Sequence, residues 1–195
     1  MRVAFIVNQF PLLSETFILN QITGLIDRGC DLDVFAHRVG EESTVHPDVH
    51  KYNLLRSTYC LTWAGPKSLI PKLLVGARYF FSSFRSNSKA ALKSINALKF
   101  GKAAVSPSWL YQTQLFLNNG PYDIVHCQFG PNGNLGLRLR ESGALSGRLV
   151  VQFRGYDISS YVQVRGRTVY DQLFRKADLI LCVSESIRAK LLELG

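Results

Sequence analysis

The sequence contains no uninterrupted apolar run of the ~18 residues that a transmembrane helix needs. Its first apolar run, Val3 to Val7, is too short for the core of a signal peptide and turns polar at Asn8. The four cysteines lie far apart, with no C-x-x-C pair, which predicts reduced thiols rather than a disulfide framework. These absences predict a protein that remains in the cytosol and does not cross a membrane.

Several motifs of nucleotide and nucleophile chemistry are also missing. No G-x-x-x-x-G-K-[ST] loop occurs, which argues against a P-loop nucleotidase, and no G-x-S-x-G elbow marks an activated serine. The glycines that begin at Gly130 follow the spacing G-x-x-G-x-x-G and not the dinucleotide fingerprint G-x-G-x-x-G. His46 and His50 are four residues apart, but Pro47 between them favours a loop, so we predict no metal site.

What the chain does have is enough apolar material for a core. Its 195 residues are 47% hydrophobic and 19% charged, with a mean hydropathy of +0.05. A chain of this size buries about two-thirds or more of its unfolded surface. This composition excludes intrinsic disorder and predicts one globular domain over residues 1–195.

Apolar runs alternate with helical patterns along the chain. A strand over Val3 to Val7, a helix from Glu15 to about Arg28 capped by Ser14, and a strand over Leu32 to Ala36 form a βαβ unit. The alternation continues with strands over 123–128, 148–153 and 178–183 and helices over 131–140, 168–176 and from 185, capped by Ser184. The sequence therefore predicts an α/β fold, a Rossmann-like parallel sheet flanked by helices.

Charge is concentrated in one part of the chain. No acidic residue occurs between Asp48 and Asp123, and that window carries a charge of +10, while the whole chain carries +9. The window is also predicted to be mostly helical, with helices over 67–84 (broken near Pro71), 88–100 and 107–117. We expect it to form a basic helical insertion, over about 51–118, between two halves of the sheet.

The basic window leaves three interpretations open. Aromatic side chains among cations suit a helix that lies on an anionic membrane, with rings at headgroup level. Ordinary helices with solvated basic faces, or a groove for single-stranded nucleic acid, have the same composition. Because no nucleic-acid-binding signature accompanies the window, we predict an anionic membrane surface and no nucleic acid as the partner. The candidate membrane residues are Lys67, Lys72, Arg78, Phe80, Phe81, Phe84 and Arg85.

Polar residues follow the predicted strands at the edge where ligands bind in open parallel sheets. They are Ser14, Glu15 and Thr16; His126, Gln128 and Gly130; Arg154, Gly155 and Asp157; and Ser184 with Glu185. We expect them to form one polar cleft.

Three of these features have a second interpretation. His126 suits either a core histidine or a site residue, and Arg154 suits either an anion or a local pair with Asp157. The loop Gly130 to Gly133 suits either phosphate, through free N–H groups at a helix N-terminus, or a simple turn with proline at the first helical position.

Four stretches of the sequence, in order, resemble one protein family. The stretch from Asn8 to Ile22 reads N-Q-F-P-L-L-S-E-T-F-I-L-N-Q-I and is similar to the opening F-P-x-x-S-E-T-F motif of family 4 glycosyltransferases that make bacterial exopolysaccharide, of the colanic acid and amylovoran type. V-H-C-Q-F-G-P from Val125 resembles that family's H-A-H-F-G-P, and F-R-G-Y-D-I-S from Phe153 resembles its F-H-G-x-D-I-S. The stretch from Tyr170 to Ser184 resembles its Y-x-x-L-F-x-x-A-D-x-x-L-x-V-S.

The resemblance implies the GT-B fold, in which two Rossmann-like domains face each other across a cleft. It also implies transfer of a sugar from a nucleotide-sugar with retention of configuration and without a cofactor or an essential metal. This chain then corresponds to the N-terminal, acceptor-side half, whose acceptor is often a lipid-linked saccharide at the cytoplasmic face of the inner membrane. The positions carried over are catalytic His126, Arg154 and Asp157 and acceptor-binding or cleft-lining Ser14, Glu15, Thr16, Gln128, Gly130 and Gly155.

The sequence departs from the family in three ways. Arg154 stands where the family has a histidine, and a guanidinium cannot accept a proton near neutrality. Gln128 replaces the second histidine of H-A-H-F-G and keeps hydrogen bonding without titration. The donor-binding domain with its E-x7-E segment is absent from these residues, so the chain alone is expected to be inactive. Two other functions stay open: a binding module for lipid-linked saccharide or another polyanion, and a different nucleotide-binding Rossmann domain.

Overall fold

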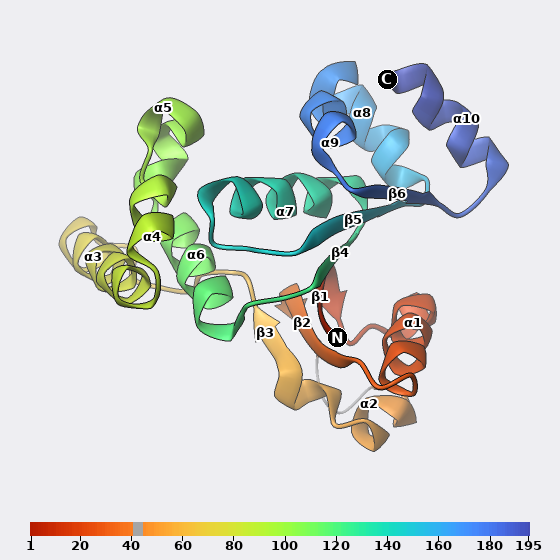
Figure 1. Cartoon of the computed structure of the whole chain (residues 1–195), viewed down its shortest axis with the longest axis horizontal. Coiled ribbons are helices and arrows are strands. Elements are labelled where there is room, and N and C mark those ends of the chain that lie inside the picture. The colour runs from red at the N-terminus through yellow and green to blue at the C-terminus, as the bar shows by residue number, and fades with distance from the viewer. Residues whose placement is uncertain (41–44) are drawn as a thin grey trace. The chain divides into compact units, whose positions relative to one another are not determined.

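The computed structural model describes residues 1–40 and 45–195. Its central feature is a six-stranded sheet in the order β3-β2-β1-β4-β5-β6, in which β2, β1, β4, β5 and β6 run parallel (Figure 1). The strands are β1 (Arg2–Phe10), β2 (Asp31–Val39), β3 (Thr58–Cys60), β4 (Ile124–Gln128), β5 (Arg148–Phe153) and β6 (Leu179–Cys182). The predicted α/β class and Rossmann-like sheet are confirmed.

The chain forms two compact units. The sheet unit comprises Met1–Tyr59, Tyr122–Leu137 and Gly147–Gly195, and the helical unit comprises Cys60–Pro121 and Arg138–Ser146. Within the sheet unit, Figure 1 shows α1 (Thr16–Ile26) and α2 (Pro47–Lys51) on one side of the sheet and α8 (Ser160–Arg165) and α9 (Asp171–Lys176) on the other. Helix α10 (Glu185–Leu194) follows β6, and α7 (Gly130–Ser142) begins in the sheet unit and ends in the helical unit. Short 3-10 turns cover Leu13–Glu15, Leu54–Ser57, Tyr156–Ile158 and Arg167–Tyr170.

The first βαβ unit forms as predicted, except at the start of its helix. Residues Leu13–Glu15 form a 3-10 turn in which the N–H of Glu15 donates to the carbonyl of Leu12 at 3.1 Å. Helix α1 therefore begins at Thr16, and Ser14 is not its cap, which corrects the sequence prediction. Val3, Phe5 and Val7 of β1 pack with the inner face of α1 in a dry core.

In the sheet unit, one further local prediction is corrected, one is confirmed, and one helix was not predicted. The expected loop after His46 is helix α2, because Pro47 occupies a first-turn position where its missing N–H costs nothing and the His46 ring accepts from the N–H of Asp48. Ser184 caps α10 as predicted, accepting from the N–H of Ile187 at 3.3 Å. Helix α8, which the sequence reading missed, is too short to show a periodic pattern.

The other face of the sheet is covered by the first two turns of α7. A Cβ at Gly133 would lie 2.7 Å from a Val151 methyl carbon, and one at Gly136 would lie 2.8 Å from the Cys127 sulfur. The glycine spacing from Gly130 thus lets the helix approach β4 and β5 closely. Alternate residues of these strands, His126, Gln128 and Gln152, belong to the opposite, α1-covered face.

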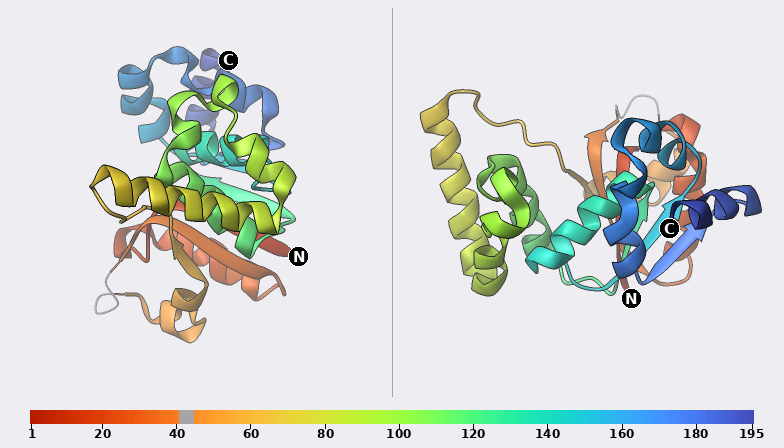
Figure 2. Two further views of the ribbon diagram at one scale, coloured as in Figure 1. Left: turned by 90° about the vertical axis from the view of Figure 1, so that its left-hand side faces the viewer. Right: turned by 90° about the horizontal axis from the view of Figure 1, so that it is seen from above.

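The helical unit contains α3 (Leu69–Ser86), α4 (Ser88–Ser94), α5 (Ala97–Phe100), the 3-10 turn Gly101–Val105 and α6 (Pro107–Asn119). Helix α3 packs against α4 and α6 (Figure 2). The predicted break at Pro71 is wrong, because this residue lies in the first turn of α3, where no intrahelical N–H bond is lost. The predicted helix over 88–100 is interrupted instead, since Asn96 starts a new helix by accepting from the N–H of Lys99.

The helical unit carries the net charge of the chain. Its residues 60–121 and 138–146 include ten basic side chains and one acidic side chain, Glu141, a balance of +9 that equals the charge of the whole chain. Among the described residues, no helix is both long enough and apolar enough to cross a bilayer.

Candidate functional site

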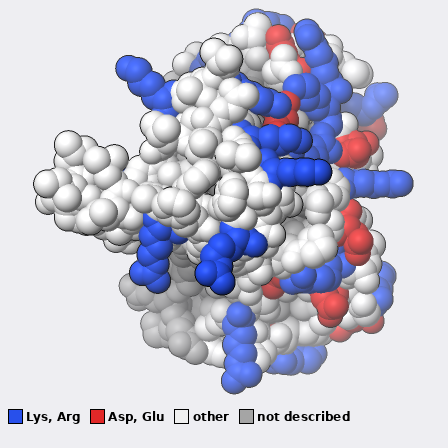
Figure 3. Space-filling view, turned by 60° about the vertical axis from the view of Figure 1, so that its left-hand side comes forward, with Lys and Arg blue, Asp and Glu red and all other residues white. Residues whose placement is uncertain are grey.

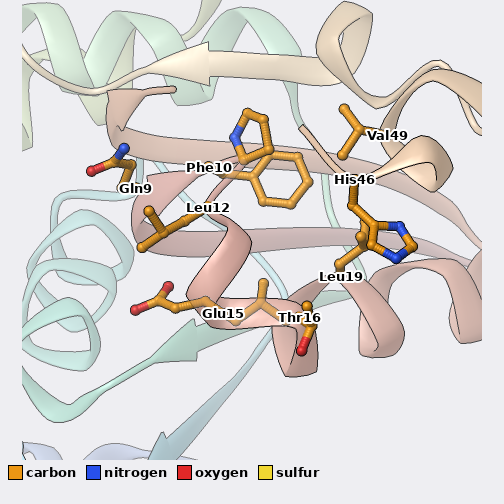
Figure 4. Close-up of a pocket in the computed structure, with 10 residues that line it drawn as sticks. Gln9, Phe10, Leu12, Glu15, Thr16, Leu19, His46 and Val49 are labelled. Carbon is orange, nitrogen blue, oxygen red and sulfur yellow. The ribbon is translucent and has the colours of Figure 1, made fainter. Parts of the chain in front are cut away.

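The connection from β1 to α1 places the serine, glutamate and threonine of the S-E-T-F motif at one end of the sheet. Ser14 and Thr16 are exposed, whereas the Glu15 side chain is half-buried. A small cavity of about 10 Å³, large enough for about one water molecule, lies between this connection and α2. Figure 4 shows Glu15 and His46 directed to opposite sides of that cavity. It is too small for a sugar, so a larger ligand has to approach Glu15 from another side.

Arg154 follows β5 and reaches the first turn of α1. Its guanidinium carbon lies 3.5 Å from the centre of the Phe17 ring, a cation–π contact. Burial lowers the pKa of Arg154, and the charges of Glu15 and Asp157 counteract that effect. Burial likewise raises the pKa of Glu15, and the charge of Arg154 opposes the rise. The opposite charges of these two partly buried side chains therefore influence each other at the edge of the sheet.

His126 lies next to this pair in β4. Its ring stacks at 4.7 Å, centre to centre, on Phe5 of β1. The pKa of His126 is lowered to about 4, chiefly by burial and also by the nearby Arg154 charge, while a hydrogen bond to Gln152 opposes both effects. The imidazole is therefore neutral at physiological pH and cannot act there as a general acid.

Three glutamines connect His126 to the next strand and to α1. Gln128 Nε2 donates to Gln21 Oε1 at 2.6 Å, and Gln21 Nε2 donates to Gln152 Oε1 at 3.0 Å. Gln152 in turn bonds to His126. Because each amide donates to the next in one direction, this series of hydrogen bonds fixes the orientation of the three glutamine side chains on the buried face of the sheet. The sequence analysis missed Gln21 and Gln152, since neither follows a strand end.

Four buried polar atoms of this cluster remain without a hydrogen-bond partner among residues 1–40 and 45–195. They are Glu15 Oε2, His126 Nε2, Gln128 Oε1 and Arg154 Nε. Buried polar groups in folded proteins nearly always have a partner, in the protein, in water or in a ligand. The cluster thus contains donors and acceptors without a partner, and the surrounding protein shields these four atoms from solvent.

Asp157 holds the backbone around Arg154. Its side chain is fully buried, and its carboxylate accepts from the N–H groups of Gly155 at 2.8 Å, Arg154 at 3.1 Å and Gly130 at 3.1 Å. The Tyr170 hydroxyl donates to its carbonyl at 2.9 Å. Asp157 thereby joins the loop after β4 to the loop after β5, and its carboxylate is engaged with the protein.

The glycines of the two loops differ in their surroundings. A Cβ at Gly130 would lie 2.5 Å from the Phe153 ring, whereas a Cβ at Gly155 would meet nothing within 4 Å. The N–H groups of Asn132 and Gly133 both donate to the Phe129 carbonyl, and that of Gly130 donates to Asp157. Because these donors have partners, the structure favours the turn over the phosphate-binding alternative for this loop.

A second polar group lies at the same end of the sheet. Asn132, which is buried, donates to Asn8 Oδ1 at 3.1 Å and to the Gln128 carbonyl at 2.7 Å, and its own side-chain oxygen bonds to His37 at 3.1 Å. Phe129, between Gln128 and Gly130, has a φ of 70°, a left-handed conformation that is uncommon outside glycine. His37 and Phe129 were not predicted as site residues, because the contacts of one and the backbone conformation of the other arise only from tertiary structure.

Within the part of the chain that the structure describes, no group of three or more His, Cys, Asp or Glu side chains could hold a metal ion. His46 and His50 lie at the ends of the short helix α2. Ser184 and Glu185 serve α10, the first as its cap and the second in an ion pair of 3.5 Å with Arg188. The structure therefore brings Glu15, His126, Gln128 and Arg154 together, with Asp157 and both glycines in the adjoining loops.

Comparison with known proteins identifies the family of the chain. The model for Glycosyltransferase Family 4 matches residues 14–195. This chain belongs to glycosyltransferase family 4. It is 33% identical over 198 residues to a protein of Escherichia coli K12 named "Putative colanic acid biosynthesis glycosyltransferase WcaL", and 32% identical over 198 residues to the amylovoran biosynthesis glycosyltransferase AmsK of Erwinia amylovora.

A WcaL protein of Salmonella typhimurium is similar to the same degree, at 33% identity over 200 residues. Each match covers the whole of this chain and 48% of the relative, so the chain spans about half the length of these relatives. The predicted family membership is confirmed, and family 4 glycosyltransferases of exopolysaccharide biosynthesis are its relatives. The matched region contains the whole polar cluster from Glu15 to Asp157.

Proposed function

We propose that this chain forms the acceptor-binding half of a retaining GT-B glycosyltransferase that acts in exopolysaccharide biosynthesis. A nucleotide-sugar is the donor, with most of its binding site in a second domain, and a lipid-linked saccharide is the acceptor. The acceptor oxygen forms a bond to the anomeric carbon, and the bond from that carbon to the diphosphate breaks. The hydroxyl proton leaves with the nucleoside diphosphate, and neither a metal nor a cofactor takes part in the proposed step.

The observation that carries this proposal is the buried polar cluster. Glu15 and Arg154 lie in two connections and Gln128 is the last residue of β4, so the three bring donors and acceptors to one edge of the sheet. A saccharide presents many hydroxyl groups that both donate and accept, so it can satisfy such a mixed set. Arg154 adds a fixed cation that suits a diphosphate or a carboxylate.

The contacts give the candidate catalytic residues different roles. Arg154 binds an anionic group of the substrate, and Phe17 holds the guanidinium in place. His126 acts as a neutral acceptor through Nε2 and not as a titrating base, because its pKa is lowered to about 4. Asp157 is a positioning residue, since its carboxylate is engaged with the backbone of both loops. Gly155 leaves room for the substrate beside Arg154.

The proposed acceptor also sets a location. A lipid-linked saccharide remains in the bilayer, so the enzyme has to work at the membrane surface. The helical unit, with its excess of nine positive charges, suits the anionic cytoplasmic face of the inner membrane. Lys67, Arg78 and Arg85 of this unit are exposed, as are Phe81 and Phe84, while Lys72 and Phe80 are half-buried.

A binding experiment on the chain tests the acceptor assignment. The probe is a short-chain prenyl-diphosphate-linked monosaccharide, titrated against the purified chain by calorimetry, with UDP-hexose and GDP-hexose titrated in parallel. We expect the prenyl-linked probe to bind and the free nucleotide-sugars to bind weakly or not at all. Tight binding of a nucleotide-sugar with no binding of the prenyl-linked probe would contradict the acceptor role.

A transfer experiment on the longer protein that contains this chain tests the reaction. Product formed from the same probe and a nucleotide-sugar is analysed by proton NMR at its anomeric centre. We expect the configuration of the donor to be kept, in the presence of EDTA. An inverted product excludes the retaining mechanism, and acceptor binding without transfer from any nucleotide-sugar supports a binding module instead.

A further inference from the structure

Helix α3 has an unusual distribution of apolar side chains. With 3.6 residues per turn, eight apolar residues fall within an arc of about 140° around the helix axis, and one of them, Phe80, is half-buried. The other seven are exposed, and the exposed fractions of the six large ones among them run from 42% to 72%. The seven, which we call the outer stripe, are Leu69, Ile70, Leu73, Leu74, Ala77, Phe81 and Phe84.

The buried residues of α3 are small, and its half-buried residues are Lys72, Val75, Tyr79, Phe80 and Ser82. Gly76 and Ser83 are buried, and a Cβ at Gly76 would lie 3.5 Å from Pro107 of α6. Tyr79, half-buried, packs its ring at 5.3 Å from that of Tyr111 in α6. Surface helices of globular proteins normally turn their apolar stripe toward the core. Helix α3 does the reverse, which indicates that the outer stripe has a partner outside the helical unit.

Charge indicates the chemistry of that partner. Arg78 and Arg85 are exposed and border the outer stripe on one side. They belong to a unit with ten basic side chains and one acidic side chain over residues 60–121 and 138–146. Among the described residues, the charged atoms in the left-hand half of Figure 3 are basic. A second copy of the chain would bring the same positive charge, whereas an anionic bilayer brings the opposite one.

We propose that α3 lies flat in an anionic membrane surface, with the outer stripe in the headgroup and acyl boundary and its arginines at the lipid phosphates. An amphipathic helix with a basic border is a known form of such an anchor. This inference rests on the membrane location in the proposed function and goes further, because it names one helix and its apolar face as the contact. The sequence predicts a membrane contact at Lys67, Lys72, Arg78, Phe80, Phe81, Phe84 and Arg85, and the proposal adds the apolar residues in the first two turns of α3.

Flotation of the purified chain with phosphatidylcholine vesicles that contain phosphatidylglycerol tests the proposal. The variant L73S/L74S removes two exposed side chains of the outer stripe. We expect its partition coefficient to fall by about tenfold or more relative to the unmodified chain. The matched control V164S/L192S removes two apolar side chains of the sheet unit that are as exposed, at 81% and 67%, and should bind as the unmodified chain does.

The outcomes separate this inference from the proposed function. If L73S/L74S binds as tightly as the unmodified chain while binding still falls with salt, the outer stripe is not the anchor, but the electrostatic membrane location stands. If the unmodified chain fails to float with these vesicles, the α3 anchor and the membrane location are both overturned. If sedimentation shows a dimer that L73S/L74S converts to a monomer, with no loss of vesicle binding, the stripe joins two copies and the proposal is wrong.

Discussion

The guanidinium carbon of Arg154 lies 3.5 Å from the centre of the Phe17 ring. This contact links the end of β5 to the first turn of α1, although the two residues are far apart in the sequence. Stacking fixes the plane of the guanidinium, and the neighbouring charge of Glu15 favours its cationic form. Arg154 is thus held ready for an anion, with its buried Nε left without a hydrogen-bond partner in the described structure.

Replacing Arg154 by alanine should therefore weaken acceptor binding more than it lowers stability. We expect a loss of affinity of about tenfold to a hundredfold for the prenyl-diphosphate-linked probe, because a charge-assisted hydrogen bond is removed. The free energy of unfolding should fall by only about 1 kcal/mol, the value of a cation–π contact. Calorimetry and urea denaturation measure the two effects.

Arg165 offers a matched control for that experiment. It is exposed, and its guanidinium lies 5.9 Å from the Tyr161 ring, so Arg165→Ala also removes a cation and a ring contact. We expect unchanged probe affinity for this variant. Equal affinities for Arg154→Ala and the unmodified chain would remove Arg154 from the site.

Asp157 should affect stability more strongly than its place in a loop suggests. Asp157→Asn puts an amide among three backbone N–H donors, so at least one buried donor loses its acceptor. We expect the free energy of unfolding to fall by about 2–4 kcal/mol, measured by urea denaturation. Asp171→Asn, at the start of α9, should cost only about 0.5 kcal/mol as a helix-dipole effect. If the two variants are equally stable, Asp157 does not hold the loops.

The order of strands and helices could be predicted because their patterns are local. The buried strand Arg148–Phe153 and the cap at Ser184 were predicted from alternating apolar runs and a polar residue before a helix. The start of α1 could not be, because Ser14 is a good cap by type and only the turn at Leu13–Glu15 decides against it. Local helix propensity is overridden where tertiary contacts fix the backbone that leads into a helix.

The candidate site was predictable in part for the same reason. Glu15 and Arg154 follow strands, and all parallel strands end at one edge, so their proximity was expected. Gln21 lies in the middle of α1 and Gln152 is the penultimate residue of β5, and only the contact of α1 with the sheet joins them to His126. A linear pattern contains no signal for such a contact.

The stability of the sheet unit should depend on pH through His126. Its pKa is lowered from 6.5 to about 4 in the folded protein, so between these values the unfolded state binds more protons. Stability is therefore full above about pH 6.5, falls as the pH decreases toward 4, and loses about 3 kcal/mol in total from this group. Urea denaturation at several pH values measures the slope.

Two histidine variants test whether His126 causes this dependence of stability on pH. His126→Gln removes the titrating ring and should flatten the dependence between about pH 6.5 and pH 4, while His50→Gln, which removes an exposed ring, should leave it in place. A slope that survives in His126→Gln means that other groups cause the acid sensitivity.

Alanine variants at two glycines in adjoining loops distinguish an effect on packing from an effect on substrate contact. Gly130→Ala forces a Cβ to within 2.5 Å of the Phe153 ring and 2.6 Å of the Tyr170 ring, so we expect a loss of about 1–3 kcal/mol or more in unfolding free energy. Gly155→Ala meets open space and has a φ of 174°, which any residue adopts, so its stability should stay within about 0.5 kcal/mol of the unmodified chain.

The affinity for the prenyl-linked probe should also distinguish Gly155→Ala from Gly130→Ala. If the substrate lies beside Arg154, the new methyl group of Gly155→Ala occupies part of its space and weakens binding by about tenfold. Because this variant is expected to fold normally, its loss of affinity cannot come from instability, in contrast to Gly130→Ala. Calorimetry on Gly155→Ala therefore tests the substrate position directly, and full affinity there would place the saccharide away from the loop after β5.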